Sequence, residues 1–169
     1  MGFYGMSLWL PQLIRQFTTS TSITATLAAV PFIAAIPAMV LIGRSSDKRG
    51  TRAVHVSFSY GLIAAGLLLT VIAGSTMWAL VGLSVVAIGN LGGQSSLFAI
   101  PRSILSASSA AAAVAVISSV SNVGGVVGPY LVGALKESTG GFAIPLLVLA
   151  ALSAAASLIV GTVVRRWVR

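Results

Sequence analysis

Two apolar stretches of the sequence contain polar side chains of the kind that bind small solutes. Ser118 and Asn122 are four residues apart, so they lie on one face of a helix. Gln94 and Ser95 are neighbours in an earlier stretch, and Phe98 follows three residues after Ser95, on the same face. Because the amides of Asn and Gln each carry two donors and an acceptor, they suit a hydroxylated or carboxylated solute.

The same polar groups have a second interpretation, and the sequence leaves both open. They either line a cavity or form hydrogen bonds between helices. Gly124 and Gly128 form a GxxxG motif, which indicates close helix packing. Near the N-terminus, Tyr4, Trp9 and Gln12 are further candidates for contact with a solute. The alternative role of the aromatic residues is that of an anchor at a membrane interface.

Residues for enzymatic catalysis are few and scattered. The two acidic residues, Asp47 and Glu137, are far apart in the sequence, and His55 is the one histidine. No pair of carboxylates, metal-ligand cluster or nucleophile–base arrangement can be assembled from them. The chain also has no cysteine, which excludes thiolate ligands and disulfides. We therefore expect no enzymatic activity, no metal site and no cofactor.

The composition is typical of a membrane protein. The chain is 57% hydrophobic and 7% charged, whereas soluble domains are about 25% charged. A surface of this composition needs lipid as part of its solvent. The net charge of +8 would indicate nucleic acid in a soluble protein, but here the basic residues flank apolar stretches, so we expect no nucleic-acid partner.

Apolar stretches of about 20 residues, the length that crosses a bilayer as a helix, predict an all-α membrane protein. The first stretch reaches Arg15 after only about a dozen residues, too few to cross the hydrocarbon. We interpret it as a span whose beginning is missing rather than as an interfacial segment. The expected spans are a partial one over 2–17, followed by 23–43, 54–73, 77–100, 107–135 and 142–164.

The stretch Gly43–Arg52 is the one dense run of charge, and we predict a short cytoplasmic loop there. Short basic loops between apolar spans lie on the cytoplasmic side of a membrane. If this loop does so, alternation places eight of the ten basic residues on that side and leaves Arg15 and Lys136 on the other. Both termini are therefore expected in the cytoplasm.

Charged side chains are missing from the interior of every predicted span. No acidic residue is available there to carry a coupling proton, and no lysine or arginine near the middle of the membrane offers an anion a counter-charge. If the chain takes part in transport, its own spans supply neutral groups alone.

Three segments resemble the major facilitator superfamily. The charged stretch reads Gly43-x-x-x-Asp47-Lys48-x-Gly50-x-Arg52, which is similar to the loop motif between spans 8 and 9 of that family. The anion:cation symporter branch, which includes sugar-acid, tartrate and phthalate permeases, resembles this chain in two further segments. They are YGMSLWLPQLIRQF over 4–17, similar to span 7, and SNVGGVVGPYLVGALKESTG over 121–140, similar to span 11.

This resemblance implies a six-helix C-terminal half, spans 7–12, with span 7 truncated. In the family, spans 7, 8, 10 and 11 of this half line a central cavity and spans 9 and 12 are peripheral. Ser95, Phe98 and Asn122 match solute-facing positions, and Phe98 stands where the family often has tryptophan. The charged motif implies a conformational latch, formed by Gly43, Asp47, Lys48, Gly50 and Arg52; its alternative is plain topology.

The function implied is transmembrane transport of an organic anion, coupled to protons, by alternating access together with an N-terminal six-span half. The expected location is a bacterial-type inner membrane. Candidate solute-binding residues are Tyr4, Gln94, Ser95, Phe98, Ser118 and Asn122. The alternative is an integral membrane fragment without transport activity of its own, because the surface meant for the missing half would be unpaired.

Overall fold

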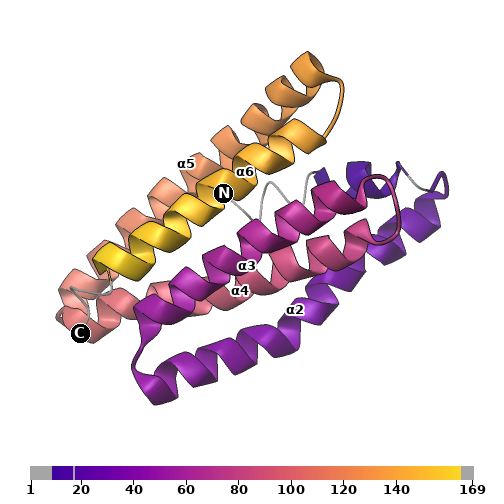
Figure 1. Cartoon of the computed structure of the whole chain (residues 1–169). Coiled ribbons are helices and arrows are strands. Elements are labelled where there is room, and N and C mark those ends of the chain that lie inside the picture. Colours follow the sequence, from indigo (N-terminus) through magenta and orange to yellow (C-terminus); the bar gives the residue numbers. More distant parts are fainter. Residues whose placement is uncertain (1–8, 17, 165–169) are drawn as a thin grey trace.

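The computed structural model describes residues 9–16 and 18–164, and these residues are almost entirely helical (Figure 1). No β-strand occurs among them. A short helix over residues 9–14 comes first. The elements that follow are α2 (Thr21–Arg49), α3 (Arg52–Ala73), α4 (Ala79–Ile104), α5 (Ala107–Thr139), α6 (Ala143–Ile159) and a π-helical continuation, η1 (Val160–Val164).

Five helical segments in the described part of the chain are long and apolar enough to cross a membrane; they are α2, α3, α4, α5 and α6 with its continuation. Only 11% to 39% of the residues in their most apolar windows are buried inside the protein. Large apolar side chains such as Ile72, which is 81% exposed, therefore require lipid around them. The prediction of an all-α membrane protein is confirmed.

The charged stretch is helical over most of its length, and the prediction of a loop over Gly43–Arg52 is wrong. α2 continues to Arg49 and ends at Gly50, which has a φ of 61° and donates its N–H to the carbonyl oxygen of Asp47. Charged side chains do not interrupt a helix, and the basic residues in its last turn complement the helix dipole. Only Gly50 and Thr51 separate α2 from α3.

Two further helices continue past the ends of the predicted spans. α4 runs through Pro101 to Ile104. α5 runs to Thr139, and Gly140, with a φ of 71°, ends it in the left-handed conformation that glycine adopts readily. Lys136 consequently stands in the last helical turn of α5 and not in a loop.

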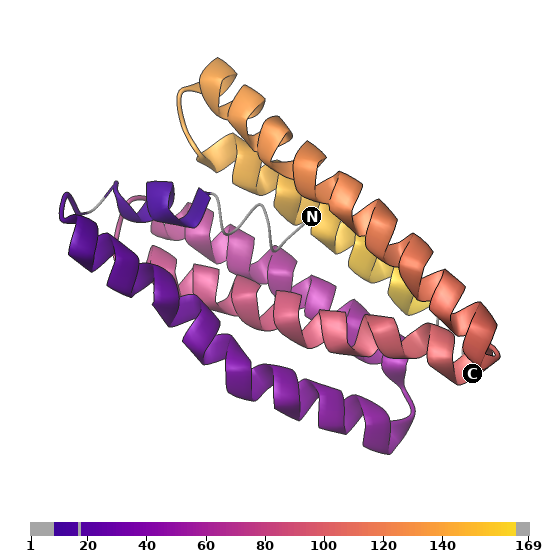
Figure 2. The same ribbon diagram turned by 180° about the vertical axis from the view of Figure 1, so that it is seen from behind.

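The helices are arranged around α3, which packs against α4 and against α6, while α2 lies on α4 (Figures 1 and 2). α5 lies beside α6 at the edge of the molecule and also contacts α4. The α2–α3 and α4–α5 turns lie at one end of the bundle (Figure 1). The helix ends that meet there carry Arg44, Lys48, Arg49, Arg52 and Arg102.

Glycines allow the backbones of α3 and α4 to approach closely. A Cβ atom on Gly66 would lie 2.7 Å from the carbonyl oxygen of Gly82, and one on Gly89 would lie 2.6 Å from that of Ser59. The hydroxyl of Thr70, buried at the same interface, donates to the Gly66 carbonyl at 2.8 Å. Because lipid provides no hydrophobic force between helices, this close van der Waals contact is what holds the pair together.

A reciprocal pair of hydrogen bonds joins α3 to α6. The Ser57 hydroxyl donates to the carbonyl of Ser157 at 2.8 Å, and the Ser157 hydroxyl donates to the carbonyl of Ser57 at 2.7 Å. Hydrogen bonds between membrane helices contribute only about 0.6 kcal/mol each on average. The pair therefore fixes the register of the two helices more than it adds to stability.

We predict that Gly66→Ala destabilises the protein and that Gly61→Ala, the same change on the same helix, does not. The new Cβ at Gly66 would collide with the Gly82 carbonyl, at a cost of about 1–3 kcal/mol. At Gly61 it would meet the Ser157 hydroxyl at an ordinary 3.5 Å, and the gain in helix propensity of about 0.5–1 kcal/mol would remain. Thermal unfolding in detergent measures both; equal melting temperatures would contradict the interface.

Candidate solute cavity

A cavity of about 770 Å³ opens between helix 9–14, α3, α4, α5 and α6. Its size falls within the range of sites that bind small molecules, about 300–1,000 Å³. Leucine, valine and isoleucine side chains form most of its wall, and none of the described lining residues is charged. The amides and hydroxyls on its two polar helices are those of Asn90 and Gln94 on α4 and Ser118, Ser121 and Asn122 on α5.

Four of the predicted solute-binding residues line this one cavity. Gln94 and Phe98 reach it from α4, and Ser118 and Asn122 reach it from α5. Gln94 and Asn122 are exposed, whereas Ser118 and Phe98 are partly buried. Two amides from different helices therefore share a concave surface, with an aromatic ring in the same wall.

Ser95 is not among the lining residues. Its hydroxyl donates to the carbonyl of Gly92 at 2.8 Å and lies 3.5 Å from the position of a Cβ on Gly43 of α2. Successive residues of a helix point about 100° apart; here Gln94 faces the cavity and Ser95 faces Gly43 of α2. Phe98 comes four residues after Gln94, about one helical turn, so it shares the face of Gln94 and not that of Ser95. Tyr4 lies outside the described residues.

Polar residues of the wall that were not predicted as solute contacts include Asn90 and Ser121 on the two polar helices and Ser59 on α3. Asn90 stands one helical turn before Gln94, so the i, i+4 spacing was a signal that could have identified it. Ser59 of α3 and Trp9 carry a hydroxyl and an indole N–H that are buried without a hydrogen-bond partner among the described residues. Because both atoms are buried, they lie within the wall and not on the surface of the cavity.

The helices around the cavity differ from those that the family resemblance implied. α2, in the position of span 8, contributes no described lining residue, whereas α3 and α6, in the positions of spans 9 and 12, do. α2 packs on another side of α4, where a Cβ on Gly92 would meet the side chain of Ile42 at 2.5 Å. The close contact through glycines places α3, and not α2, beside the polar face of α4.

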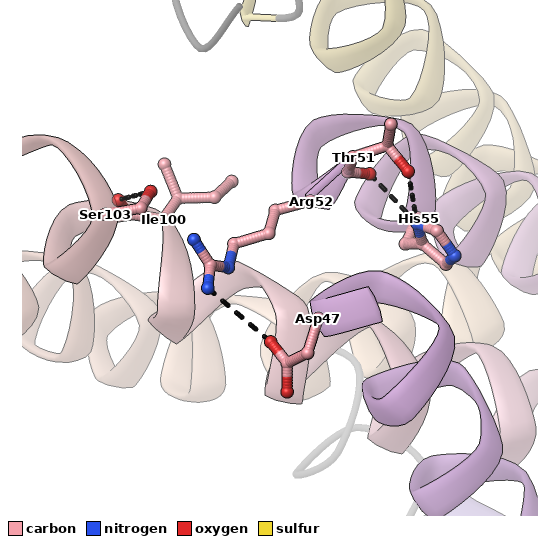
Figure 3. A network of polar contacts seen from close by, with 6 residues as sticks. All are labelled: Asp47, Thr51, Arg52, His55, Ile100 and Ser103. Atoms are coloured by element: carbon pink, nitrogen blue, oxygen red, sulfur yellow. Dashed lines mark hydrogen bonds and ion pairs between the residues drawn. The ribbon is translucent and has the colours of Figure 1, made fainter. Parts of the chain in front are cut away.

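The five residues of the charged motif do not form one cluster: two of them form an ion pair, and the other three have different neighbours. Arg52 at the start of α3 points to Asp47 near the end of α2, with 3.5 Å between a guanidinium nitrogen and a carboxylate oxygen (Figure 3). The Asp47 side chain is 68% exposed, so the pair contributes under about 1 kcal/mol to stability. Lys48 is exposed, Gly50 ends α2, and Gly43 packs toward Ser95 of α4.

His55 belongs to a separate set of contacts at this end of the bundle (Figure 3). Its Nδ1 atom lies 2.9 Å from the carbonyl oxygen of Thr51, which requires a proton on that nitrogen. In the neutral ring, Nε2 then accepts from the hydroxyl of Ser45 at 3.1 Å. The histidine thereby links the end of α2 to the start of α3.

These features define a class, a multi-pass α-helical membrane protein whose spans enclose a cavity with polar groups on two helices. Within this class the chain belongs to the Major Facilitator Superfamily, whose family model matches residues 1–168. The family consists of transporters and not of enzymes. The resemblance inferred from the three sequence segments is confirmed.

Two putative tartrate transporters of Agrobacterium vitis are similar to the chain, with 37% and 39% identity over 139 residues. These residues are 82% of this chain and 31% and 32% of the relatives. A quinolone resistance transporter of Acinetobacter baumannii is 38% identical over 141 residues, 83% of this chain and 32% of the relative. The chain thus spans about a third of the length of these relatives. No solved structure matches it.

Because the chain has no cysteine, single cysteines can report which positions face water. We predict that Ser118→Cys and Asn122→Cys react about tenfold faster with a small methanethiosulfonate than Leu158→Cys, since the reaction needs a thiolate and hence water. Leu158 is the control because it is 68% exposed on α6 but absent from the cavity wall. Labelling in proteoliposomes measures the rates; equal rates at the three positions would contradict a hydrated cavity.

Proposed function

We propose that this chain is the C-terminal half of a transporter that moves an organic anion across the membrane. The observation that carries this proposal is the shared cavity, in which Gln94 and Asn90 of α4 face the same space as Asn122 of α5. Neutral amides bind carboxylate and hydroxyl groups by hydrogen bonds, yet they release them more readily than a buried charge would.

The similarity to putative tartrate transporters supports a small carboxylate as the solute. Tartrate carries hydroxyls beside its carboxylates, and both are partners for amides and serine hydroxyls. The proposed solute therefore matches the donors and acceptors of the wall, and the Gln94, Phe98, Ser118 and Asn122 side chains are its proposed contacts.

Proton-coupled transport further requires a group that carries the proton, and the described cavity wall does not provide one. The wall contains no carboxylate, so in our proposal the coupling proton is carried by an N-terminal half. The two halves rock about the solute and expose it to one side at a time. The end of the bundle rich in arginine and lysine faces the cytoplasm, in keeping with the positive-inside rule, and the membrane is a bacterial-type inner membrane.

One observation favours the alternative of a fragment without activity of its own. A row of large side chains along α5 is exposed at helical spacing and absent from the cavity wall, namely Val116, Val123, Val127 and Tyr130. In a complete transporter part of this row would meet the other half. Without it, the row is an unpaired apolar surface that promotes self-association.

A chimera tests the proposal directly. The segment of an Agrobacterium vitis relative that aligns with this chain is replaced by the chain itself, and uptake of labelled tartrate into membrane vesicles is measured. Uptake above that of empty vesicles is the expected result. A chimera that reaches the membrane at the level of the parent, yet takes up neither tartrate nor other small carboxylates, would contradict it. Transport of a quinolone alone would place the solute in another class.

In this chimera we expect Asn122→Leu and Gln94→Met, which keep side-chain volume but remove the amide, to raise the KM for tartrate about tenfold each. The loss of hydrogen bonds to a charged ligand, about 1.5–3 kcal/mol, is the physical reason. Ser95→Ala is the matched control, because its hydroxyl is bonded within α4, and its KM should stay within about twofold. If Ser95→Ala raised the KM as much as the other two substitutions, the cavity would not be the site that binds the solute.

The proposed latch yields a separate prediction. Asp47→Asn should lower the maximal rate of uptake several-fold without raising KM, because the pair with Arg52 joins the ends of two helices far from the cavity residues. Melting temperature should barely change, since the carboxylate is mostly exposed. Glu137→Gln, at the chain's other acidic residue, is the control and should leave the rate unaltered. A loss of stability with an unchanged rate would assign the pair to structure alone.

A further inference from the structure

Lys136 stands at the end of the cavity where α5 ends and α6 begins, above two aromatic rings of the wall. Its ammonium nitrogen lies 4.4 Å from the ring centroid of Phe142 and 5.4 Å from that of Trp9. The two rings form an edge-to-face pair with centroids 5.8 Å apart, and both line the cavity. The charge is thus fixed beside the cavity by ring faces.

The partners of this ammonium are all neutral. Its one described hydrogen bond goes to the side-chain oxygen of Gln12, at 3.1 Å. The ion pair found among the described residues joins Arg52 to Asp47 at the opposite end of the bundle, and Glu137 is exposed. An ammonium has three donors and no acceptor, so Lys136, which has no counter-charge among its described partners, keeps donors for an incoming anion.

We propose that Lys136 receives the carboxylate of the solute at this end of the cavity, before the solute reaches the amides of α4 and α5. The inference rests on the proposed function and adds the group that supplies positive charge. Lys136 follows Asn122 by fourteen residues on the same helix, which is about 21 Å along its axis. The two positions are therefore successive stations and not one site.

A purely structural role is the competing explanation, because the same contacts tie helix 9–14 to α5 and α6. A substitution at the neutral partner, Gln12, distinguishes the two roles. Gln12→Glu would keep the tether and place a carboxylate beside the ammonium, which strengthens the contact but occupies the charge. A structural lysine would be unaffected or favoured by this change, whereas an anion-binding lysine would lose its ligand.

The experiment uses the full chain in lipid nanodiscs, with tartrate as the probe and Trp9 as the reporter. The sequence has three tryptophans, so Trp78→Phe and Trp167→Phe leave Trp9 as the single emitter. We expect a saturable change of emission with tartrate at constant ionic strength, and no change with its neutral diamide. No response to tartrate, or an equal response to the diamide, would overturn the proposal.

Variants of the pair complete the test. Lys136→Met keeps the apolar stem over the rings, and both it and Gln12→Glu should weaken tartrate binding at least about tenfold. Lys136→Arg should bind within about threefold of the parent, and Arg15→Gln, which removes another basic residue near Gln12, should have no effect. Unchanged binding in Lys136→Met or in Gln12→Glu would overturn the proposal.

The transport chimera keeps this inference apart from the proposed function. There Lys136→Met should raise the KM for tartrate about tenfold while the maximal rate stays the same. If the chimera transports tartrate and Lys136→Met leaves KM unchanged, the role of Lys136 falls and the function stands. If the chimera fails to transport while the fluorescence titration behaves as expected, the function falls and the anion site stands.

Discussion

The contact between α3 and α4 determines where every other described helix lies. In a bilayer, no hydrophobic force draws two apolar helices together, so they stay in contact only where their surfaces fit closely. Gly66 and Gly82 provide that fit by bringing backbone against backbone. α3 then holds α6 through the Ser57–Ser157 bonds, and α4 holds α2. α5 remains at the edge, with contacts to α4 and α6, and it carries Ser118, Ser121 and Asn122 of the cavity wall.

The five long apolar helices could be predicted from the sequence, but their ends could not. Hydropathy reports where a chain leaves lipid, whereas a helix ends where its backbone can no longer continue. Between Gly43 and Arg49 the side chains become charged while the backbone remains a good helix, so α2 extends beyond its apolar part. The true ends are at Gly50 and Gly140, where only a residue without a Cβ adopts the positive φ at no steric cost.

The cavity residues could be predicted from the sequence only where the geometry of a single helix determines which residues share a face. The four-residue spacing of Ser118 and Asn122 placed both on one face, and the structure gives both to the cavity. The choice between Gln94 and Ser95 could not be made in this way, because it depends on which neighbour lies on which side of α4. Ser59 and Lys136 illustrate the same limit, since their importance arises from contacts with helices distant in sequence.

In our proposal, the distribution of charge explains how a neutral cavity can serve an anion. A lysine or arginine in the middle of a span is costly in lipid. At the ends of the bundle the same charge is solvated, and there the chain has Lys136 at one end and the basic helix ends at the other. Gln12 and the two rings hold Lys136 without neutralising it, which a carboxylate partner would do. In our proposal, Lys136 therefore concentrates the anion at the entrance, and the neutral amides of α4 and α5 bind it further in.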